Sequence, residues 1–197
     1  MKDNFQNLKQ NLKIEGNRIR LVSFTEKHLH DSHYLSWLHD YDVIKYLNLP
    51  SYLAHKVSFD EVKAYVESAL RSDNLLFLAM ETSEGKFIGT FKIGPIDWHA
   101  KNVNLGVLIG DRASWGKGIC TEAFEMAIKF CFEELEMHKI VGGCMEPNSG
   151  MRRVFEKFGF VVEGRFREQD FLEGKWCDHL HFGLLKKEWD GKALSQK

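Results

Sequence analysis

The sequence lacks an excess of charge of either sign and has no long apolar run. Its net charge is −1, so it has no global basic field to attract nucleic acid or an acidic membrane. No apolar run approaches transmembrane length, and the polar residues 1–13 are typical of neither a signal peptide nor a membrane anchor. We therefore expect a cytoplasmic protein with no nucleic-acid partner and no membrane partner.

Cysteine is sparse, and the sequence contains no Cys-x-x-Cys pair. Four scattered cysteines in a chain of this size favour small buried side chains over a disulfide framework. Cys177, His179 and His181 alternate along one expected strand, but three ligands at this spacing on a flat strand converge poorly on a metal. We expect polar side chains on a solvent or groove face there, and no metal site.

Length and composition predict one globular domain. The chain has 197 residues, of which 44% are hydrophobic and 13% aromatic, enough for a substantial core and unlike a disordered chain. We expect a loose or helical N-terminal extension over residues 1–13, a single domain over 14–190 and a C-terminal tail over 191–197.

Apolar periodicity predicts an α/β domain with a mostly antiparallel sheet. The expected strands cover residues 18–24, 75–81, 87–96, 102–110, 139–145, 160–171 and 175–185. The expected helices cover 26–41, 118–136 and 148–158, and a further helix begins at the capping box of 58–61. A long helix between strands 102–110 and 139–145 implies that these two strands are parallel. A ligand would enter the sheet at this junction.

A glycine-rich loop joins strand 102–110 to the following helix. Free N–H groups at a helix start, together with the helix dipole, bind phosphate, and glycines at 116 and 118 let a ligand approach the backbone. Lys117 is followed by Gly118, which breaks the nucleoside-triphosphate pattern, and Thr121 stands where a dinucleotide loop needs glycine. The loop predicts a phosphate-bearing cofactor, with a simple turn as the alternative.

Four ordered blocks resemble the GNAT acetyltransferases, in particular the RimJ and RimL ribosomal-protein branch. They are residues 115–123, 146–148, 152–160, and 163–165 taken with 174–178. The resemblance implies the GNAT fold, a mixed and mostly antiparallel sheet with two splayed parallel central strands and flanking helices. It also implies that acetyl-CoA, as acetyl donor, sits between the splayed strands and that the acetyl group moves to a primary amine.

The same resemblance implies a set of cofactor-binding residues. The backbone of Leu108 and Ile109 would pair with the pantetheine arm, and loop amides would hold the pyrophosphate. The full expected set is Leu108, Ile109, Arg112, Trp115, Gly116, Lys117, Gly118, Ile119, Cys120, Thr121, Asn148, Arg153 and Lys157. For Arg153 and Lys157 an ordinary solvated helix face is the alternative.

The resemblance implies a carboxylate base but supplies no acid. Asp170 matches the base of the ribosomal branch, with an exposed hairpin carboxylate as the alternative interpretation, and Glu146 is a second candidate. The family's acid positions hold Phe155 and Met151, so the departing thiolate would take its proton from solvent or from the amine. Cys144 is either a covalent acetyl carrier or a packed core residue.

The expected acceptor is a protein N-terminal α-amine. Such an amine, with a pKa of about 8, is partly neutral at pH 7, whereas a lysine amine near 10.4 is not. A small-molecule amine (amino sugar, polyamine or aminoglycoside) is the alternative, and a non-catalytic acyl-CoA-binding protein is an alternative of another class. Trp37 and Tyr41, on an apolar stripe that faces either the core or a groove, are the expected acceptor contacts, and a homodimer is left open.

Overall fold

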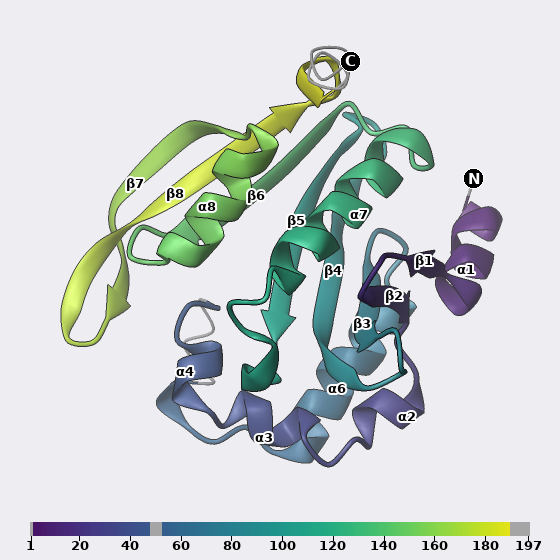
Figure 1. Ribbon diagram of the computed structural model, residues 1–197, viewed down its shortest axis with the longest axis horizontal. Coiled ribbons are helices and arrows are strands. Elements are labelled where there is room, and N and C mark those ends of the chain that lie inside the picture. The colour runs from purple at the N-terminus through teal and green to yellow at the C-terminus, as the bar shows by residue number, and fades with distance from the viewer. Residues whose placement is uncertain (1, 48–52, 190–197) are drawn as a thin grey trace.

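The computed structural model describes residues 2–47 and 53–189, and these contain one eight-stranded sheet. The strand order is β1-β2-β3-β4-β5-β6-β8-β7 (Figure 1), and every neighbouring pair is antiparallel except β5 with β6. The expected α/β class is confirmed, and the strands that the sequence predicts are present within a residue or two. The strands observed, of which β1 was not predicted, are β1 Lys13–Glu15, β2 Ile19–Ser23, β3 Leu76–Thr82, β4 Phe87–Asp97, β5 Asn102–Ile109, β6 Lys139–Met145, β7 Val161–Leu172 and β8 Lys175–Leu185.

The two parallel strands β5 and β6 pair over a short distance and then splay. Their register covers only Asn102 to Asn104 against Lys139 to Val141, although β5 continues to Ile109 and β6 to Met145. The helix α7 Ile119–Glu133 makes the crossover between them. In Figure 1 the two strands diverge toward the loops that follow them. We call the space between their diverging ends the fork.

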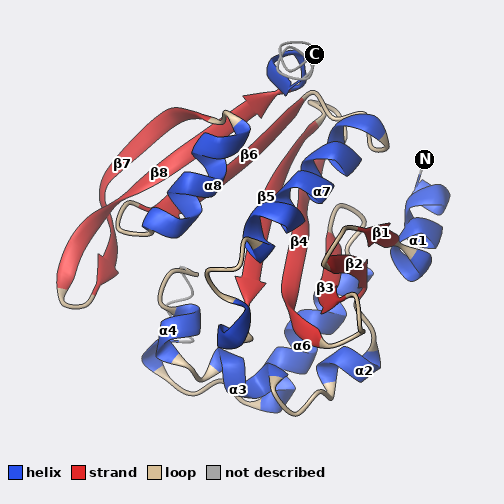
Figure 2. Ribbon diagram, viewed as in Figure 1, coloured by secondary structure: helices blue, strands red, loops and turns tan. Residues whose placement is uncertain are grey.

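Helices cover both faces of the sheet and enclose two apolar clusters. Helices α7 and α8 Ser149–Phe158 lie on one face (Figure 2), where Phe91, Phe124 and Phe155 are fully buried. The opposite face is covered by α2 Glu26–Leu29, α3 Tyr34–Leu38, α4 Tyr41–Ile44 and α6 Phe59–Arg71. Successive side chains of the central strands point to opposite faces of the sheet and so pack alternately into the two clusters.

The prediction of one helix over residues 26–41 is wrong. The segment forms the three short helices α2, α3 and α4, because aspartates inside it bond to the local backbone. The Asp31 side chain accepts from the His33 N–H at 2.9 Å, and the Asp40 side chain accepts from the Asp42 N–H at 3.0 Å. Such short-range bonds compete with a continuous helix and favour a new start.

The N-terminal segment is helical and packed, rather than loose. Helix α1 Lys2–Asn11 buries Phe5, whose ring contacts Trp98 at a centroid distance of 5.1 Å. Lys9 Nζ donates to the carbonyls of Ala69 and Ser72 at the end of α6, where helix carbonyls lack internal partners. The expected tail at 191–197 lies outside the described residues.

Candidate functional site

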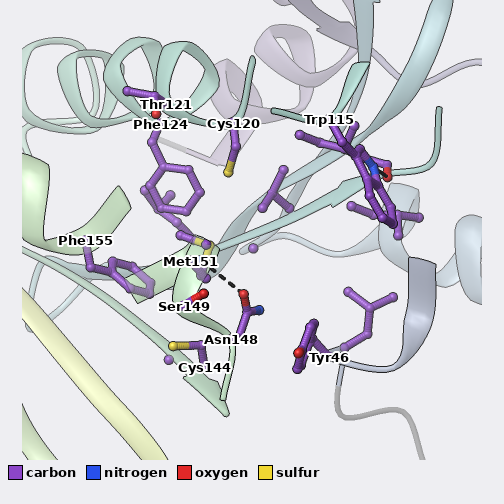
Figure 3. A pocket seen from close by; sticks show the side chains of 18 of the residues that line it. Tyr46, Trp115, Cys120, Thr121, Phe124, Cys144, Asn148, Ser149, Met151 and Phe155 are labelled. Carbon is purple, nitrogen blue, oxygen red and sulfur yellow. Dashed lines mark hydrogen bonds between the residues drawn. The ribbon is translucent and has the colours of Figure 1, made fainter. Parts of the chain in front are cut away.

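A cavity of about 850 Å³ occupies the fork and passes through the sheet. On the side of α7 and α8 it is lined by Cys120, Phe124, Met151 and Phe155 (Figure 3). Lining residues on the opposite side are Lys92, Gly106, Gly143, His179 and His181. Because β5 has no strand partner beyond Asn104 on this side, its backbone edge faces the cavity there. The site can therefore accept one ligand from each face of the sheet.

The glycine-rich loop forms one end of the cavity. Gly118 is the N-cap of α7 with φ of 75°, and Gly116 has φ of 71°, a region that glycine enters without steric cost. A Cβ on Gly116 would meet no atom within 4 Å, so this part of the loop is open. Free N–H groups at the start of α7 add the partial positive charge that suits phosphate.

Arg18 and Glu122 brace this loop from outside the cavity. The Arg18 guanidinium donates to the carbonyls of Lys117 and Gly118. The buried Glu122 carboxylate accepts from the Arg18 N–H at 2.8 Å and from Arg18 Nε at 2.7 Å. Burial alone would raise the pKa of Glu122, but the hydrogen bonds and charge of Arg18 outweigh it and lower that pKa. Neither residue could be predicted from the sequence, since they are 104 positions apart and no motif joins them.

Most of the expected cofactor residues line the cavity. They are Leu108, Ile109, Trp115, Gly116, Gly118, Ile119, Cys120, Thr121 and Asn148. The Ile109 carbonyl already accepts from Trp115 Nε1 at 2.8 Å, so one of its lone pairs is taken. The Asn148 side chain caps α8 by accepting from the Met151 N–H at 3.1 Å (Figure 3).

Four other expected cofactor residues lie outside the main cavity. Lys157 lines a smaller hollow beside Thr121 and Gly118, whereas Lys117, Arg112 and Arg153 line neither space. Arg112 is held by Asp40 at 3.3 Å and Asp42 at 3.2 Å. Of these four side chains, Lys157 is the one that borders a hollow next to the loop residues Gly118 and Thr121.

Asp170 is buried and reaches the cavity through a histidine. It is 3% exposed, so the alternative of an exposed hairpin carboxylate is wrong. Its Oδ2 lies 2.6 Å from His179 Nδ1, while its Oδ1 has no hydrogen-bond partner among the described residues. His179 lines the cavity, and a Cβ on Gly143 would lie 2.6 Å from its Nε2. The missing side chain of Gly143 thus leaves room for the imidazole at the fork.

Glu146, the second expected base, is engaged elsewhere. Its carboxylate lies 2.9 Å from Arg165 Nη1, and the same guanidinium nitrogen lies 2.8 Å from Asp178 Oδ2. Glu146 is not among the residues that line the cavity. The geometry therefore favours the Asp170–His179 pair over Glu146 for proton transfer.

Neither of the expected acceptor contacts, Trp37 and Tyr41, lines the cavity. Trp37 is 8% exposed and belongs to the core, because Gly110 leaves room for its indole: a Cβ there would lie 2.0 Å from Trp37 Cδ2. Of the two alternatives for the stripe, core or groove, the structure places Trp37 in the core and outside the cavity lining. Tyr41 is exposed and does not line the cavity, whereas Tyr46 does. Tyr46 was not predicted, because it lies beyond the end of the expected helix 26–41, in the segment that follows α4.

The remaining polar side chains of the site do not form a metal centre. Cys144 lines the cavity, and burial raises the pKa of its thiol to about 11. The ring of His181 contacts that of Phe166 in a tilted arrangement, with 4.3 Å between the ring centroids. Within residues 2–47 and 53–189, no group of three or more His, Cys, Asp or Glu side chains could hold a metal ion. Over the same ranges, no helix is long and apolar enough to cross a bilayer.

Comparisons with known proteins agree on one family. Residues 18–161 match a family model described as an acetyltransferase (GNAT) domain. YjcK of Bacillus subtilis (strain 168), described as a probable N-acetyltransferase, is 32% identical over 127 residues, 64% of this chain and 70% of the relative. The ribosomal protein uS5-alanine N-acetyltransferase of Escherichia coli (strain K12) is 30% identical over 86 residues, 43% of each chain.

A solved structure extends the likeness to the whole fold. It is spermidine N-acetyltransferase from Vibrio cholerae in complex with CoA and spermine. The TM-score is 0.77 at 20% identity, covering 87% of this chain and 97% of that one. At this identity the likeness concerns the fold alone.

Proposed function

The chain belongs to the GNAT acetyltransferases, and we propose that it transfers an acetyl group from acetyl-CoA to the N-terminal α-amine of a protein. The observation that carries the proposal is the cavity in the fork, with the glycine loop and the start of α7 at one end and His179 at the other. The relative that acts on an alanine of ribosomal protein uS5 supports this acceptor class.

The residues around the fork fit acetyl-CoA. The open Gly116 and the free N–H groups of α7 suit a pyrophosphate, and the unpaired edge of β5 beyond Asn104 suits the amides of a pantetheine arm. Acetyl-CoA, when bound, supplies the thioester. The loop residues 115–121 would hold the phosphates, and Lys157 would lie beside them as a counter-charge.

His179 is the base in this proposal, and Asp170 positions it. The ammonium form of the acceptor gives one proton to Nε2, and the buried Asp170 carboxylate on Nδ1 stabilises the imidazolium. The neutral amine then forms its bond to the thioester carbon, and the carbon–sulfur bond breaks. The second amine proton goes to the departing thiolate, since Phe155 and Met151 carry no acidic proton. The imidazolium returns its proton to solvent.

A small-molecule amine is the second candidate acceptor. A solved structure with the same fold holds spermine, so a polyamine is included, together with amino sugars and aminoglycosides. Phe155 and Met151, at positions where the family often has a proton donor, favour the third candidate, a protein that binds acyl-CoA without turnover.

The test is acetyl-CoA consumption with a panel of peptides and small amines, measured against pH. We expect His179→Gln and Asp170→Asn to lose tenfold or more in kcat/KM near pH 6.5, where the acceptor is mostly protonated. The loss should shrink above about pH 8, where an α-amine deprotonates unaided. His99→Gln, at the exposed β4–β5 turn, is the control.

Two outcomes would contradict the proposal. Wild-type pH profiles in both variants would remove the Asp170–His179 pair from the reaction. Tight acetyl-CoA binding with no turnover on any amine of the panel would favour the binding protein.

A further inference from the structure

The cavity contains an ammonium group on the face opposite α7 and α8. Lys92 lies on β4 between Phe91 and Ile93, which are buried in the cluster beneath α7, so strand alternation directs Lys92 to the other face. Its partner across the β4–β5 ladder is Gly106, and a Cβ on Gly106 would lie 3.6 Å from Lys92 Cε. The lysine stem therefore crosses β5 toward the fork, over the space that Gly106 leaves.

This ammonium has no protein partner in the part of the chain that the structure describes. Lys92 Nζ makes no hydrogen bond or ion pair with residues 2–47 or 53–189. Residues 48–52, which lie between these ranges, include neither Asp nor Glu. Burial lowers the pKa of Lys92 because it removes water from the charged form. An anion placed in the cavity would compensate that loss of solvation.

The acidic groups near the cavity are already paired. Asp42 is the single carboxylate among the described lining residues, and it lies 3.0 Å from Lys45 and 3.2 Å from Arg112. Asp170 is bonded to His179 through Oδ2, and its buried Oδ1 has no hydrogen-bond partner among the described residues. The face that Lys92 shares with the two histidines thus offers cationic or neutral groups and no free carboxylate among the described residues.

We infer that Lys92 binds an anionic group of the acceptor, a carboxylate or a phosphate that lies close to the reacting amine. The inference rests on the proposed function and narrows its acceptor class. On a peptide the anion is an acidic side chain next to the N-terminal residue, and on a small molecule it is the compound's own carboxylate or phosphate. A polyamine presents ammonium groups instead, and the ammonium of Lys92 would repel them.

The experiment compares acceptors that differ only in charge. One arm uses N-terminal peptides with Asp or Asn at the second position. The other arm uses a free amino acid against its amide, and an amino sugar against its phosphate ester, with spermidine as the cationic probe. For every compound we would measure kcat/KM, and also the Kd for the CoA-bound protein, so that the result does not depend on turnover.

We expect the anionic member of at least one pair to be preferred tenfold or more over its neutral partner, and over spermidine. Lys92→Met should reduce that ratio to about one, Lys92→Arg should keep most of it, and Lys92→Glu should reverse it in favour of spermidine. Lys129→Met, an exposed lysine on α7, is the matched control. CoA affinity and Tm of each variant show whether it is folded.

Three results would overturn the inference: no charge preference in any wild-type pair, a preference that survives Lys92→Met, or an equal loss for both members of each pair. The last result would place Lys92 at the thioester instead of at the acceptor. Anion preference in binding without turnover would sustain the Lys92 site and defeat the proposed transfer. Turnover with no preference for the anionic acceptors would support the proposed transfer and overturn the Lys92 site.

Discussion

The brace behind the glycine loop gives the sharpest test of how the site is built. Glu122 accepts hydrogen bonds from the Arg18 N–H, Arg18 Nε and, at 3.4 Å, the Ile19 N–H. In Glu122→Gln the remaining carbonyl can keep the backbone donors, but the new NH₂ group faces the guanidinium. One charge-assisted bond is lost, which is worth about 1.5–3 kcal/mol.

We expect Glu122→Gln to lower the free energy of unfolding by about 2 kcal/mol at pH 7, since Arg18 is half exposed and the lower part of that range applies. In a chain of this length the loss corresponds to about 4–8 °C in Tm. Arg18 would also hold the carbonyls of Lys117 and Gly118 less firmly, and about 1 kcal/mol of lost preorganisation weakens acetyl-CoA binding about fivefold.

The effect should depend on pH with a definite sign. Because the folded-state pKa of Glu122 is lowered, its stabilisation is present above the unfolded value of about 4.3 and is lost as the pH falls through the folded value. Urea unfolding at pH 7 and pH 3 should therefore show a large gap between wild type and variant that narrows in acid.

The control is Glu125→Gln, an exposed carboxylate one turn further along α7, expected to stay within about 0.5 kcal/mol of wild type. If Glu122→Gln behaves like this control at pH 7, or if its deficit persists unchanged at pH 3, then the carboxylate does not act as a charged brace.

Two further predictions concern the cavity itself. Gly116→Glu should abolish acetyl-CoA binding in calorimetry, while Gly174→Glu, with the same left-handed backbone and equally open space in the β7–β8 turn, should bind normally; equal affinities would refute the loop as the pyrophosphate site. Cys144→Ser should retain acetyl transfer, because a thiol with a pKa of about 11 is protonated at neutral pH; an acetylated wild-type intermediate seen by mass spectrometry and absent from the variant would instead identify a covalent carrier.

The sequence predicted the fold well wherever the signal was local. Strand alternation and the capping box at Ser58 gave element positions within a few residues, and the box forms as expected, with the Ser58 N–H donating to Glu61 at 2.7 Å. The prediction of a helix over 26–41 was wrong because a shared apolar face does not reveal that the Asp31 and Asp40 side chains bond to nearby backbone N–H groups. A side chain that serves as a cap and one that faces solvent look the same in a pattern of apolar residues.

The functional site, too, was predictable only where its residues are close together in the sequence. The glycine loop was visible because its chemistry lies in consecutive residues. Asp170 meets His179, and Lys92 crosses Gly106, only because of the register between neighbouring strands. The spacing of these residues along the chain does not reveal that register. The apolar stripe alone could not decide between core and groove for Trp37, because the space that it fills is created by a distant glycine, Gly110.

The short pairing of β5 with β6 has a mechanical consequence. Only three register pairs join β5 to β6, and thus the strands β1–β5 to the strands β6–β8. A ligand that lies along β5 and contacts β6 would add bonds between these two parts of the sheet where the strands themselves do not pair. The sheet would then become more rigid as the ligand site fills. At a ligand concentration a hundred times its Kd, binding raises the free energy of unfolding by about 2.7 kcal/mol. The acetyl donor would therefore be a reactant and would also hold β5 and β6 in place relative to each other while the acceptor is bound.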